Sequence, residues 1–345
     1  MNISGPIAIG EPFLRRLARA TVANASVQIA AALWIAAHVA VLALAQGYLP
    51  FDRPALSGKS FALQVALPSL GLLEVFVLMG VVYFITSARE PVDIAARAPD
   101  RRIAGRETAA LLVYAALGQT GGWLLGPALG FRPFSFHIAG TLFGCSTPPS
   151  PGEVATWAGY NFVVFAVLPL LWFRRRYNPT RLNLRSSDRV NDLIVILALV
   201  VIESLVELGA FPGLLTLTPR QLLIGMPASF ALFFAGTVLP TMVLIYAILI
   251  PRYLRLTGSF STTVLLGGLT YAAMHLVEGW SNFTTPSAAA LSLIFVLLSY
   301  VGPGMIKTFI TLRTGNAWVH AIGYHAIAPH VIVDTPMMAK LLGIQ

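Results

Sequence analysis

Long apolar stretches alternate with short polar segments along the whole chain. The hydrocarbon core of a bilayer is about 30 Å thick, so a helix that crosses it needs roughly 20 predominantly apolar residues. Nine stretches meet this requirement, at about 27–47, 63–86, 108–129, 153–173, 193–213, 222–250, 262–281, 288–306 and 316–335. The pattern therefore predicts an all-α, polytopic transmembrane helical bundle of about nine spans. The sixth stretch is overlong and contains Pro227, Gly236 and Pro240, so we expect a kink or a break in it.

The basic residues are distributed unevenly between the two sides of these spans. Counted on alternate sides, 18 of the 23 Lys and Arg residues fall on one side and 5 on the other. Cytoplasmic loops carry an excess of Lys and Arg, so we expect the amino end to be cytoplasmic and the carboxyl end to be outside. The larger group includes Arg252 and Lys307, which the pattern assigns to loops. Residues 11–26 combine apolar and basic side chains, and form either an amphipathic helix on the inner leaflet or a charged tail that only sets topology.

Composition excludes several other classes of protein. With 57% hydrophobic and 11% charged residues, the chain is too apolar for a soluble globule of 345 residues. The net charge of +9 does not indicate a nucleic-acid partner, because the arginines cluster between apolar runs. A single cysteine, Cys145, excludes an internal disulfide framework. We expect an integral protein of a bacterial cytoplasmic (inner) membrane.

The basic loop near residues 174–189 divides the chain into two parts. We expect an amino-terminal membrane part, 1–190, with the amphipathic segment and four spans, and a core of five spans, 191–345, that carries the polar site. In the amino-terminal part the polar residues at membrane depth stand apart from one another, which favours structural hydrogen bonds between helices. These residues are His38, Glu74, Gln119 and Asn161.

The last apolar stretch carries an unusual set of ionisable residues. His320, His325, His330 and Asp334 lie between Arg313 and Thr335, although the chain has only six histidines and fourteen acids. Ionisable groups at membrane depth are costly and mark functional sites by default. The five-residue spacing turns each histidine by about 140° from the last in an α-helix, so the three cannot share one face. Pro329 removes a backbone hydrogen bond, and a bend there would bring His325 and His330 together, with His320 near the interface.

Two other spans in the second part carry acids. Glu203 and Glu207 are four residues apart, on one helical face, and cannot both stay ionised in a low dielectric without a nearby cation. They share a proton, bind a metal, face a water-filled vestibule, or lie solvated at the outer interface. In the seventh stretch His275 and Glu278 lie three residues apart, close to the face of Tyr271.

These groups also agree in depth. Counted at about 1.5 Å per residue along parallel spans, Glu203, Glu207, His275, His325 and His330 lie in one slab near or just beyond the midplane. The candidate catalytic residues are Glu203, Glu207, His275, Glu278 and His325. The candidate metal ligands are His275, His325, His330 and Glu207, a donor set that suits zinc or iron.

From about residue 235 onward the order of motifs resembles the CPBP family (CAAX prenyl protease and bacteriocin-processing, or Abi) of intramembrane proteases. Gly315, Asn316 and Trp318 fit the family's turn before its last helix, His325 fits the histidine of its HxxxN motif, and Tyr271 with His275 fits FxxxH. The EExxxR motif is degenerate. Thr241 and Met242 stand where the family has paired glutamates, Tyr246 replaces its arginine, and Pro329 replaces the asparagine of the last motif. The resemblance implies an intramembrane site whose water-activating glutamates are missing.

Three functional hypotheses follow. The first is a membrane enzyme whose His and carboxylate groups act on a hydrophobic substrate, by prenyl-protease-like hydrolysis of a peptide or lipid or by metal-dependent modification of a lipid or isoprenoid. The second is a non-catalytic CPBP-like protein that binds a partner or a lipid. The third is a proton-coupled transporter. The oligomeric state and the substrate are not predicted.

Overall fold

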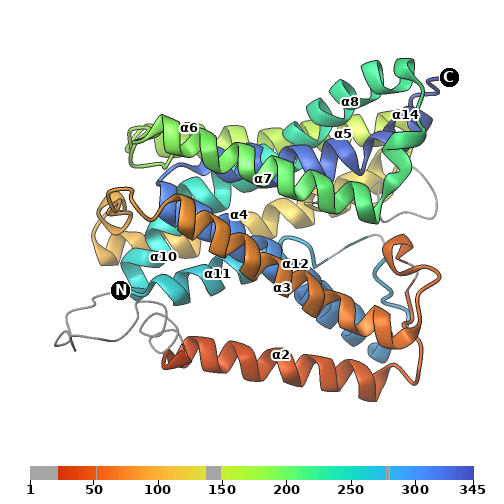
Figure 1. Cartoon of the computed structure of the whole chain (residues 1–345), viewed down its shortest axis with the longest axis horizontal. Helices are drawn as coiled ribbons and strands as arrows, with labels where there is room; N and C mark the ends of the chain where they lie inside the picture. Colours follow the sequence, from red (N-terminus) through yellow and green to blue (C-terminus); the bar gives the residue numbers. More distant parts are fainter. Residues whose placement is uncertain (1–21, 52, 137–148, 277, 279) are drawn as a thin grey trace.

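The computed structural model describes residues 22–51, 53–136, 149–276, 278 and 280–345. Its helices carry the labels of Figure 1, where most of them run along the long axis of the view. The first helices are α2 (Ala25–Leu44), α3 (Phe61–Ile85) and α4 (Arg101–Ala128), followed by α5 (Pro151–Asn161), η4 (Phe162–Val167), α6 (Leu168–Arg174) and α7 (Arg189–Ala210). They are followed by α8 (Pro219–Phe233), η6 (Phe234–Val238), α9 (Leu239–Thr241), η7 (Met242–Leu249), α10 (Ile250–Thr257), α11 (Phe260–Ala273), α12 (Pro286–Thr314), α13 (Ala317–His320), η8 (Ala321–Ile332) and α14 (Thr335–Leu341).

The prediction of an all-helical membrane bundle is confirmed. Seven helices in the described part of the chain are long and apolar enough to cross a membrane, and they match the first six predicted spans and the eighth. The other two are shorter: α11 has 14 residues, and the last predicted span is divided into α13 and η8. Nine spans and the predicted orientation therefore stay predictions. The amphipathic segment at 11–26 and Cys145 lie largely or wholly outside the described residues.

Proline positions explain where the long helices widen. The π-helical stretches η4, η6 and η7 are each followed within two residues by a proline, at Pro169, Pro240 and Pro251, and η8 contains Pro329. Proline has no N–H to donate, and its ring clashes with the carbonyl four residues earlier. A turn with one extra residue relieves the clash without ending the helix. The sixth predicted span is therefore one helical run, Pro219–Thr257, and is not broken at its prolines.

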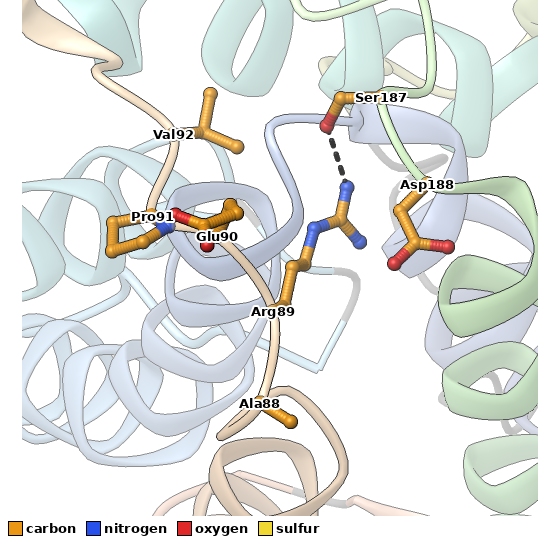
Figure 2. Close-up of a pocket in the computed structure, with 7 residues that line it drawn as sticks. All are labelled: Ala88, Arg89, Glu90, Pro91, Val92, Ser187 and Asp188. Atoms are coloured by element: carbon orange, nitrogen blue, oxygen red, sulfur yellow. Dashed lines mark hydrogen bonds between the residues drawn. The ribbon is translucent and has the colours of Figure 1, made fainter.

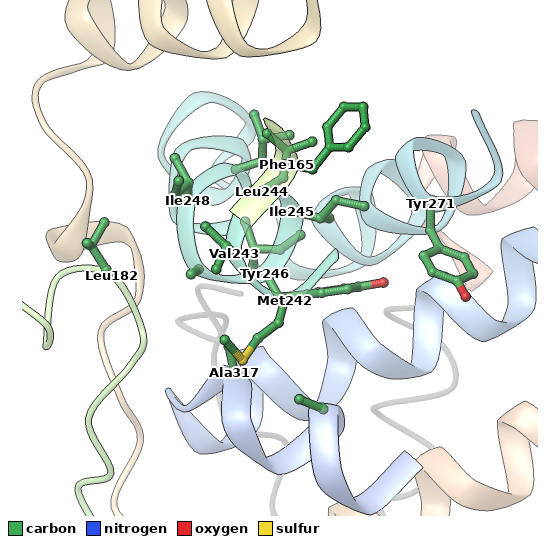
Figure 3. Packing of buried hydrophobic residues seen from close by; sticks show 14 of the residues in the cluster. Phe165, Leu182, Met242, Val243, Leu244, Ile245, Tyr246, Ile248, Tyr271 and Ala317 are labelled. Atoms are coloured by element: carbon green, nitrogen blue, oxygen red, sulfur yellow. The ribbon is translucent and has the colours of Figure 1, made fainter. Parts of the chain in front are cut away.

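The centre of this run forms the core. All eight residues of η7 are buried, and they belong to one apolar cluster with Phe165, Leu182, Tyr271 and Ala317, part of which Figure 3 shows. A helix that is apolar all round is enclosed by protein or lipid. η7 is enclosed by protein, whereas α2, with exposed Leu33, Ile35 and Val39, offers its apolar side chains to lipid. α2 accordingly lies at the edge of the bundle in Figure 1.

Small residues allow α11 and α12 to approach closely. A Cβ atom placed on Gly304 would lie 2.5 Å from the Cβ of Tyr271 and 2.8 Å from the Cα of Gly268. Glycine at such contacts lets transmembrane helices pack backbone against backbone. This contact brings Tyr271, on α11, next to the middle of α12.

Two basic residues lie elsewhere than predicted. Lys307 was expected in a cytoplasmic loop, but α12 continues to Thr314, and Lys307 is inside the bundle with 1% of its surface exposed. Arg252 was also expected in a loop, yet it is 1% exposed and forms an ion pair of 2.6 Å with Glu107 of α4. A hydropathy reading ends a span at the first charge, whereas a helix continues wherever a partner or an aromatic face accepts that charge. Two of the 18 residues counted as cytoplasmic are therefore interior.

At one end of the bundle, loops and helix ends form a polar junction, made of Arg89, Arg97, Asn183, Asp192 and Asn316. Arg89 pairs with Asp192 and donates to the carbonyl of Thr314 at 2.6 Å. Arg97 donates to the side chain of Asn183 at 2.7 Å and to the carbonyl of Gly315. The last carbonyls of a helix have no partner within it, so these guanidinium groups complete the end of α12. Burial, and secondly the charge of Arg89, lower the pKa of Arg97 below its ordinary value.

Candidate functional site

η8 brings two of the predicted histidines together. In a π-helix the hydrogen bond runs between residues five apart, so these residues stack above one another. His325 and His330 have this spacing, and their ring centroids are 5.2 Å apart. Both are buried, with 2% and 7% of their surface exposed. They lie together as predicted, but through a widened helix around Pro329 and not through a simple bend.

Two hydroxyl groups hold the ring of His325. Its Nδ1 lies 3.3 Å from Oγ1 of Thr241, and its Nε2 lies 3.3 Å from the hydroxyl of Tyr271. The single proton of Thr241 is directed to the backbone carbonyls of Thr237 and Val238, at 2.9 and 3.0 Å. We therefore assign the proton of His325 to Nδ1, which donates to Thr241, while Nε2 accepts from Tyr271.

His275 lies on the other side of Tyr271. Its Nδ1 is 2.7 Å from the carbonyl oxygen of Tyr271, which can only accept, so Nδ1 carries the proton. Its ring centroid is 4.4 Å from that of Tyr271 and 4.1 Å from that of Tyr300 on α12, on which it stacks. Tyr271 thus connects His275 to His325, whose ring centroid is 5.9 Å from that of Tyr271.

His330 forms a dyad with Asp334. Its Nδ1 is 3.0 Å from Oδ2 of Asp334, and the carboxyl group is 2% exposed. The imidazole stacks on Phe233 of α8 with 4.5 Å between centroids and an interplanar angle of 7°. The hydroxyl of Ser229, also on α8, donates to the backbone carbonyl of His330. The ring is therefore held by Asp334 at Nδ1 and by Phe233 against its face, and Ser229 fixes the backbone behind it. We call Tyr271, His275, His325, His330 and Asp334 the histidine site.

Glu278 lies near this site, beside Tyr300. It is 2% exposed and hydrogen-bonded to Tyr300, the ring on which His275 stacks. The guanidinium of Arg53, from the loop between α2 and α3, lies 6.0 Å from the centroid of Tyr300 and donates to Ser299 at 3.0 Å. Of the three glutamates predicted to be catalytic, Glu278 is thus the one that is linked to His275, through the ring of Tyr300.

Glu203 and Glu207 belong to a different group of side chains. They project from α7, which packs along η8, and their charges interact with Glu74 of α3, the residue predicted to stand alone. Glu203 also interacts with Lys307, whose Nζ lies 3.7 Å from the ring centroid of Tyr271. We call Glu74, Glu203, Glu207, Lys307 and His320 the lysine cluster. The lysine cluster adjoins the histidine site, because Tyr271 contacts Lys307 and because Glu207 interacts with Asp334. The residues predicted as one site thus lie in two neighbouring groups.

The isolated polar residues of the first part mostly behave as predicted. His38 of α2 is hydrogen-bonded to Ser69 of α3 at 3.1 Å, and Asn161 of α5 donates to the carbonyl of Gly236 in η6 at 3.0 Å. Gln119 of α4 contacts the sulfur of Met274 at 3.6 Å. These three are interhelical hydrogen bonds. Glu74 is the exception, because its partners are on α7.

His320 does not lie at the periphery, where we expected it. It is fully buried, with its ring centroid 4.1 Å from that of Tyr246 in η7 and its Nδ1 3.3 Å from Oγ1 of Thr311. Its partners, Tyr246 and Thr311, differ from those of His325 and His330.

The predicted zinc or iron ligands do not form a coordination sphere as they lie. Among the described residues, no group of three or more His, Cys, Asp or Glu side chains is placed to hold a metal ion. Glu207 lies in the lysine cluster, and Tyr271 stands between His275 and His325. The metal stays a prediction, and no chemical step below depends on it.

The residues that sequence reasoning missed are Lys307, the hydroxyl of Tyr271 and that of Thr241. The signal for Lys307 was available, since residues 308–312 continue the apolar pattern beyond it. Thr241 was noted only as the replacement of a glutamate. Its Oγ1 lies 3.3 Å from Nδ1 of His325.

A surface pocket of about 560 Å³ lies beside the polar junction, lined by Ala88, Arg89, Glu90, Pro91, Val92, Ser187 and Asp188. Figure 2 shows Arg89 turned toward Ser187, to which it donates at 2.8 Å. Because this guanidinium also pairs with Asp192, its charge is already balanced by the fold. The histidine site, with three oriented imidazoles, is the stronger candidate for chemistry.

Comparison with known proteins finds no match: no family model fits the chain, and no curated protein or solved structure is significantly similar to it.

Proposed function

We propose that the protein is an intramembrane hydrolase in which the His330–Asp334 dyad is the general base. The observation that carries this proposal is the 3.0 Å contact between Nδ1 of His330 and Asp334 beside His325. A carboxylate that accepts from Nδ1 fixes the tautomer of the imidazole, so Nε2 is the basic nitrogen. The same carboxylate stabilises the imidazolium that forms when Nε2 takes up a proton. Such a dyad can supply the base that the degenerate EExxxR motif lacks.

The reaction is hydrolysis of a carbonyl compound. His330 takes a proton from water at Nε2, the hydroxide adds to the carbonyl carbon, and the imidazolium returns the proton to the leaving group. Water and substrate thus give an acid and an alcohol, thiol or amine, with the proton restored. His325, held by Tyr271 and Thr241, is the second imidazole of the site and lies 5.2 Å from the base between ring centroids. Both of its ring nitrogens are engaged by these two hydroxyl groups, so it lines the site beside the base.

The substrate is hydrophobic and reaches the site through the bilayer. The side chains around the histidine site are buried among apolar helices, and such surroundings favour an acyl or prenyl chain over a polar metabolite. A lipid ester or a prenylated peptide of a bacterial cytoplasmic membrane fits this description and the resemblance to prenyl proteases.

The test uses purified protein in nanodiscs with a fluorogenic acyl ester and a fluorogenic prenylated peptide. Wild-type protein should hydrolyse one of them, and His330→Ala and Asp334→Asn should lower kcat/KM by about 10²–10⁴-fold. His38→Ala is the matched control, since His38 is bonded to Ser69 at the edge of the bundle, and it should retain activity. Full activity in folded His330→Ala would overturn the assignment of the base.

The non-catalytic alternative rests on a specific observation as well, the replacement of a glutamate by Thr241. If folded wild-type protein hydrolyses neither probe but binds the acyl chain, and His330→Ala binds it equally, the protein is a lipid-binding relative without catalysis.

A further inference from the structure

Lys307 is the most unusual charged residue outside the histidine site. It lies seven residues before the end of α12, with 1% of its surface exposed. Its Nζ lies over two aromatic rings, 3.7 Å from the centroid of Tyr271 and 5.7 Å from that of Tyr324. An ammonium group at this depth is costly even with cation–π contacts, so its surroundings must offer further compensation.

The compensation comes from groups with unused hydrogen-bonding capacity. Within the described part of the chain, Oε1 of Glu203, Nε2 of His320 and the hydroxyl of Tyr246 are buried without a hydrogen-bond partner. The three residues are 5%, 0% and 0% exposed, and the charge of Lys307 interacts with both Glu203 and His320. Buried polar atoms without partners are rare and demand an explanation.

The tautomer of His320 makes it an acceptor toward Lys307. The hydroxyl of Thr311 donates to the carbonyl of Lys307 at 2.9 Å, so this hydroxyl accepts from Nδ1 of His320. Nε2 of His320 therefore carries a lone pair. Lys307 thus has a neutral imidazole base and a carboxyl group among its neighbours.

Charge balance in this cluster requires bound protons. Glu74, Glu203 and Glu207 interact with one another, and Lys307 is the cation that the described residues place among them. Three carboxylates with one ammonium cannot all stay ionised in a low dielectric. At least one proton is therefore held between these groups.

We propose that Lys307, Glu203 and His320 form an intramembrane proton-exchange site, with the half-buried Glu74 and Glu207 as its connection to the surface. In one step the Lys307 ammonium passes a proton to the Glu203 carboxylate, which leaves a neutral amine and a carboxylic acid. In the other step the ammonium passes it to Nε2 of His320, which leaves an amine and an imidazolium. The remaining titratable groups that face the site are Tyr246 of η7, Tyr271 of α11, Tyr324 of η8, and Asp334 beside Glu207.

The site does not depend on the proposed hydrolase activity. Its ligand is the proton, and proton binding is measured without any substrate. Lys307 contacts Tyr271, and Tyr271 donates to His325. In this proposal, a change in the protonation of Lys307 therefore acts on the histidine site through Tyr271.

The experiment is infrared difference spectroscopy of the purified protein in nanodiscs, titrated with pH in H₂O and D₂O. Wild-type protein should show a C=O stretching band of a protonated carboxyl group that shifts in D₂O, and Glu203→Gln should remove it. Lys307→Met and His320→Gln should each displace the pH midpoint of this band by about one pH unit or more. Glu153→Gln is the matched control, because Glu153 is ion-paired with Arg132 at 2.8 Å and contributes no such band.

The proposal fails if the band is unchanged in Glu203→Gln, or if its titration is the same in His320→Gln and wild type. His320→Gln decides the question if Lys307→Met does not fold, since it keeps the buried charge and removes only one acceptor. Loss of hydrolysis in His330→Ala with an intact carboxyl band would leave this site standing, so the two proposals fail separately.

Discussion

The polar junction and the lysine cluster both hold buried charges, but the charges are compensated by different groups in the two regions. In the junction, Arg89 and Arg97 reach a carboxylate, an asparagine side chain and the last carbonyls of α12. In the lysine cluster, Glu203 and His320 each keep a buried polar atom without a hydrogen-bond partner among the described residues, as does Tyr246 beside His320. Both guanidinium groups of the junction thus have charged or carbonyl partners, although Nε of Arg89 has none among the described residues. The cluster, in our proposal, is completed by a proton.

The position of each region along the helices explains the difference. The junction lies at helix ends, where backbone carbonyls are available because no later residue in the helix pairs with them. The cluster lies in helix interiors, where backbone groups are already bonded and only side chains can compensate a charge. The ion pairs of the junction therefore sit at helix ends, and the proton-exchange site that we propose lies in helix interiors.

Asp192→Ala should have the largest effect on stability. It leaves the side chain of Arg89 buried without its carboxylate, and the loss of one partner of a buried pair costs about 3–5 kcal/mol. The free energy of unfolding, measured in mixed detergent micelles, should fall by this amount. Asp93→Ala, at an exposed residue that accepts from Ala96, should cost about 1 kcal/mol or less, and equal losses would contradict the comparison.

Gly304→Ala should disturb the contact between α11 and α12. The new Cβ would lie 2.5 Å from the Cβ of Tyr271, so the helices must separate, at a cost of about 1–3 kcal/mol. Gly80→Ala, in α3 with nothing within 4 Å, should be neutral or stabilising. Thermal unfolding of the two variants side by side checks this, and a stabilised Gly304→Ala would show that the close approach is not required.

Tyr271→Phe should cost less, about 1 kcal/mol, because it removes one hydrogen bond to Nε2 of His325. Tyr253→Phe removes a similar bond, to Thr270 at 2.8 Å, and should cost as much. Only Tyr271→Phe should move the ¹⁵N resonances of His325. Equal spectra for the two variants would mean that the hydroxyl of Tyr271 is not bonded to His325. Tyr271 would then not connect the lysine cluster to the histidine site.

Glu203→Gln should have the smallest effect on stability, within about 0.5 kcal/mol or in the stabilising direction, because the carboxyl group already lacks a partner at Oε1. Glu107→Gln offers the contrast, since it removes the ion pair with the buried Arg252 and should cost about 1–3 kcal/mol. A large loss in Glu203→Gln would show that this carboxylate is a structural partner of Lys307, as in the junction.

Much of the architecture was predictable, because hydropathy acts on each segment separately. The all-helical bundle follows from local composition, and a disturbance of the helices near Pro240 and Pro329 follows from the missing N–H of proline. The sequence predicted a kink, a break or a bend at these prolines, not the widening that the structure shows. The pairing of His325 with His330 was predictable from Pro329, although the π-helical form of η8 was not. The burial of Lys307 was missed because a hydropathy window cannot know that an aromatic ring from α11 will cover a charge.

By itself, the sequence determined that this is a helical membrane protein whose ionisable groups at membrane depth are mostly in the second part of the chain. Length and apolar pattern are properties of each segment, so no tertiary contact was needed to read them. Only the tertiary structure decided which ionisable groups meet. It joined His325 to Tyr271, and it placed Glu203 and Glu207 of α7 near Glu74 of α3, with Glu203 also near Lys307 of α12. Contacts between side chains of different helices depend on how each helix is rotated and on close approaches such as that at Gly304. Both are set by the packing of whole helices.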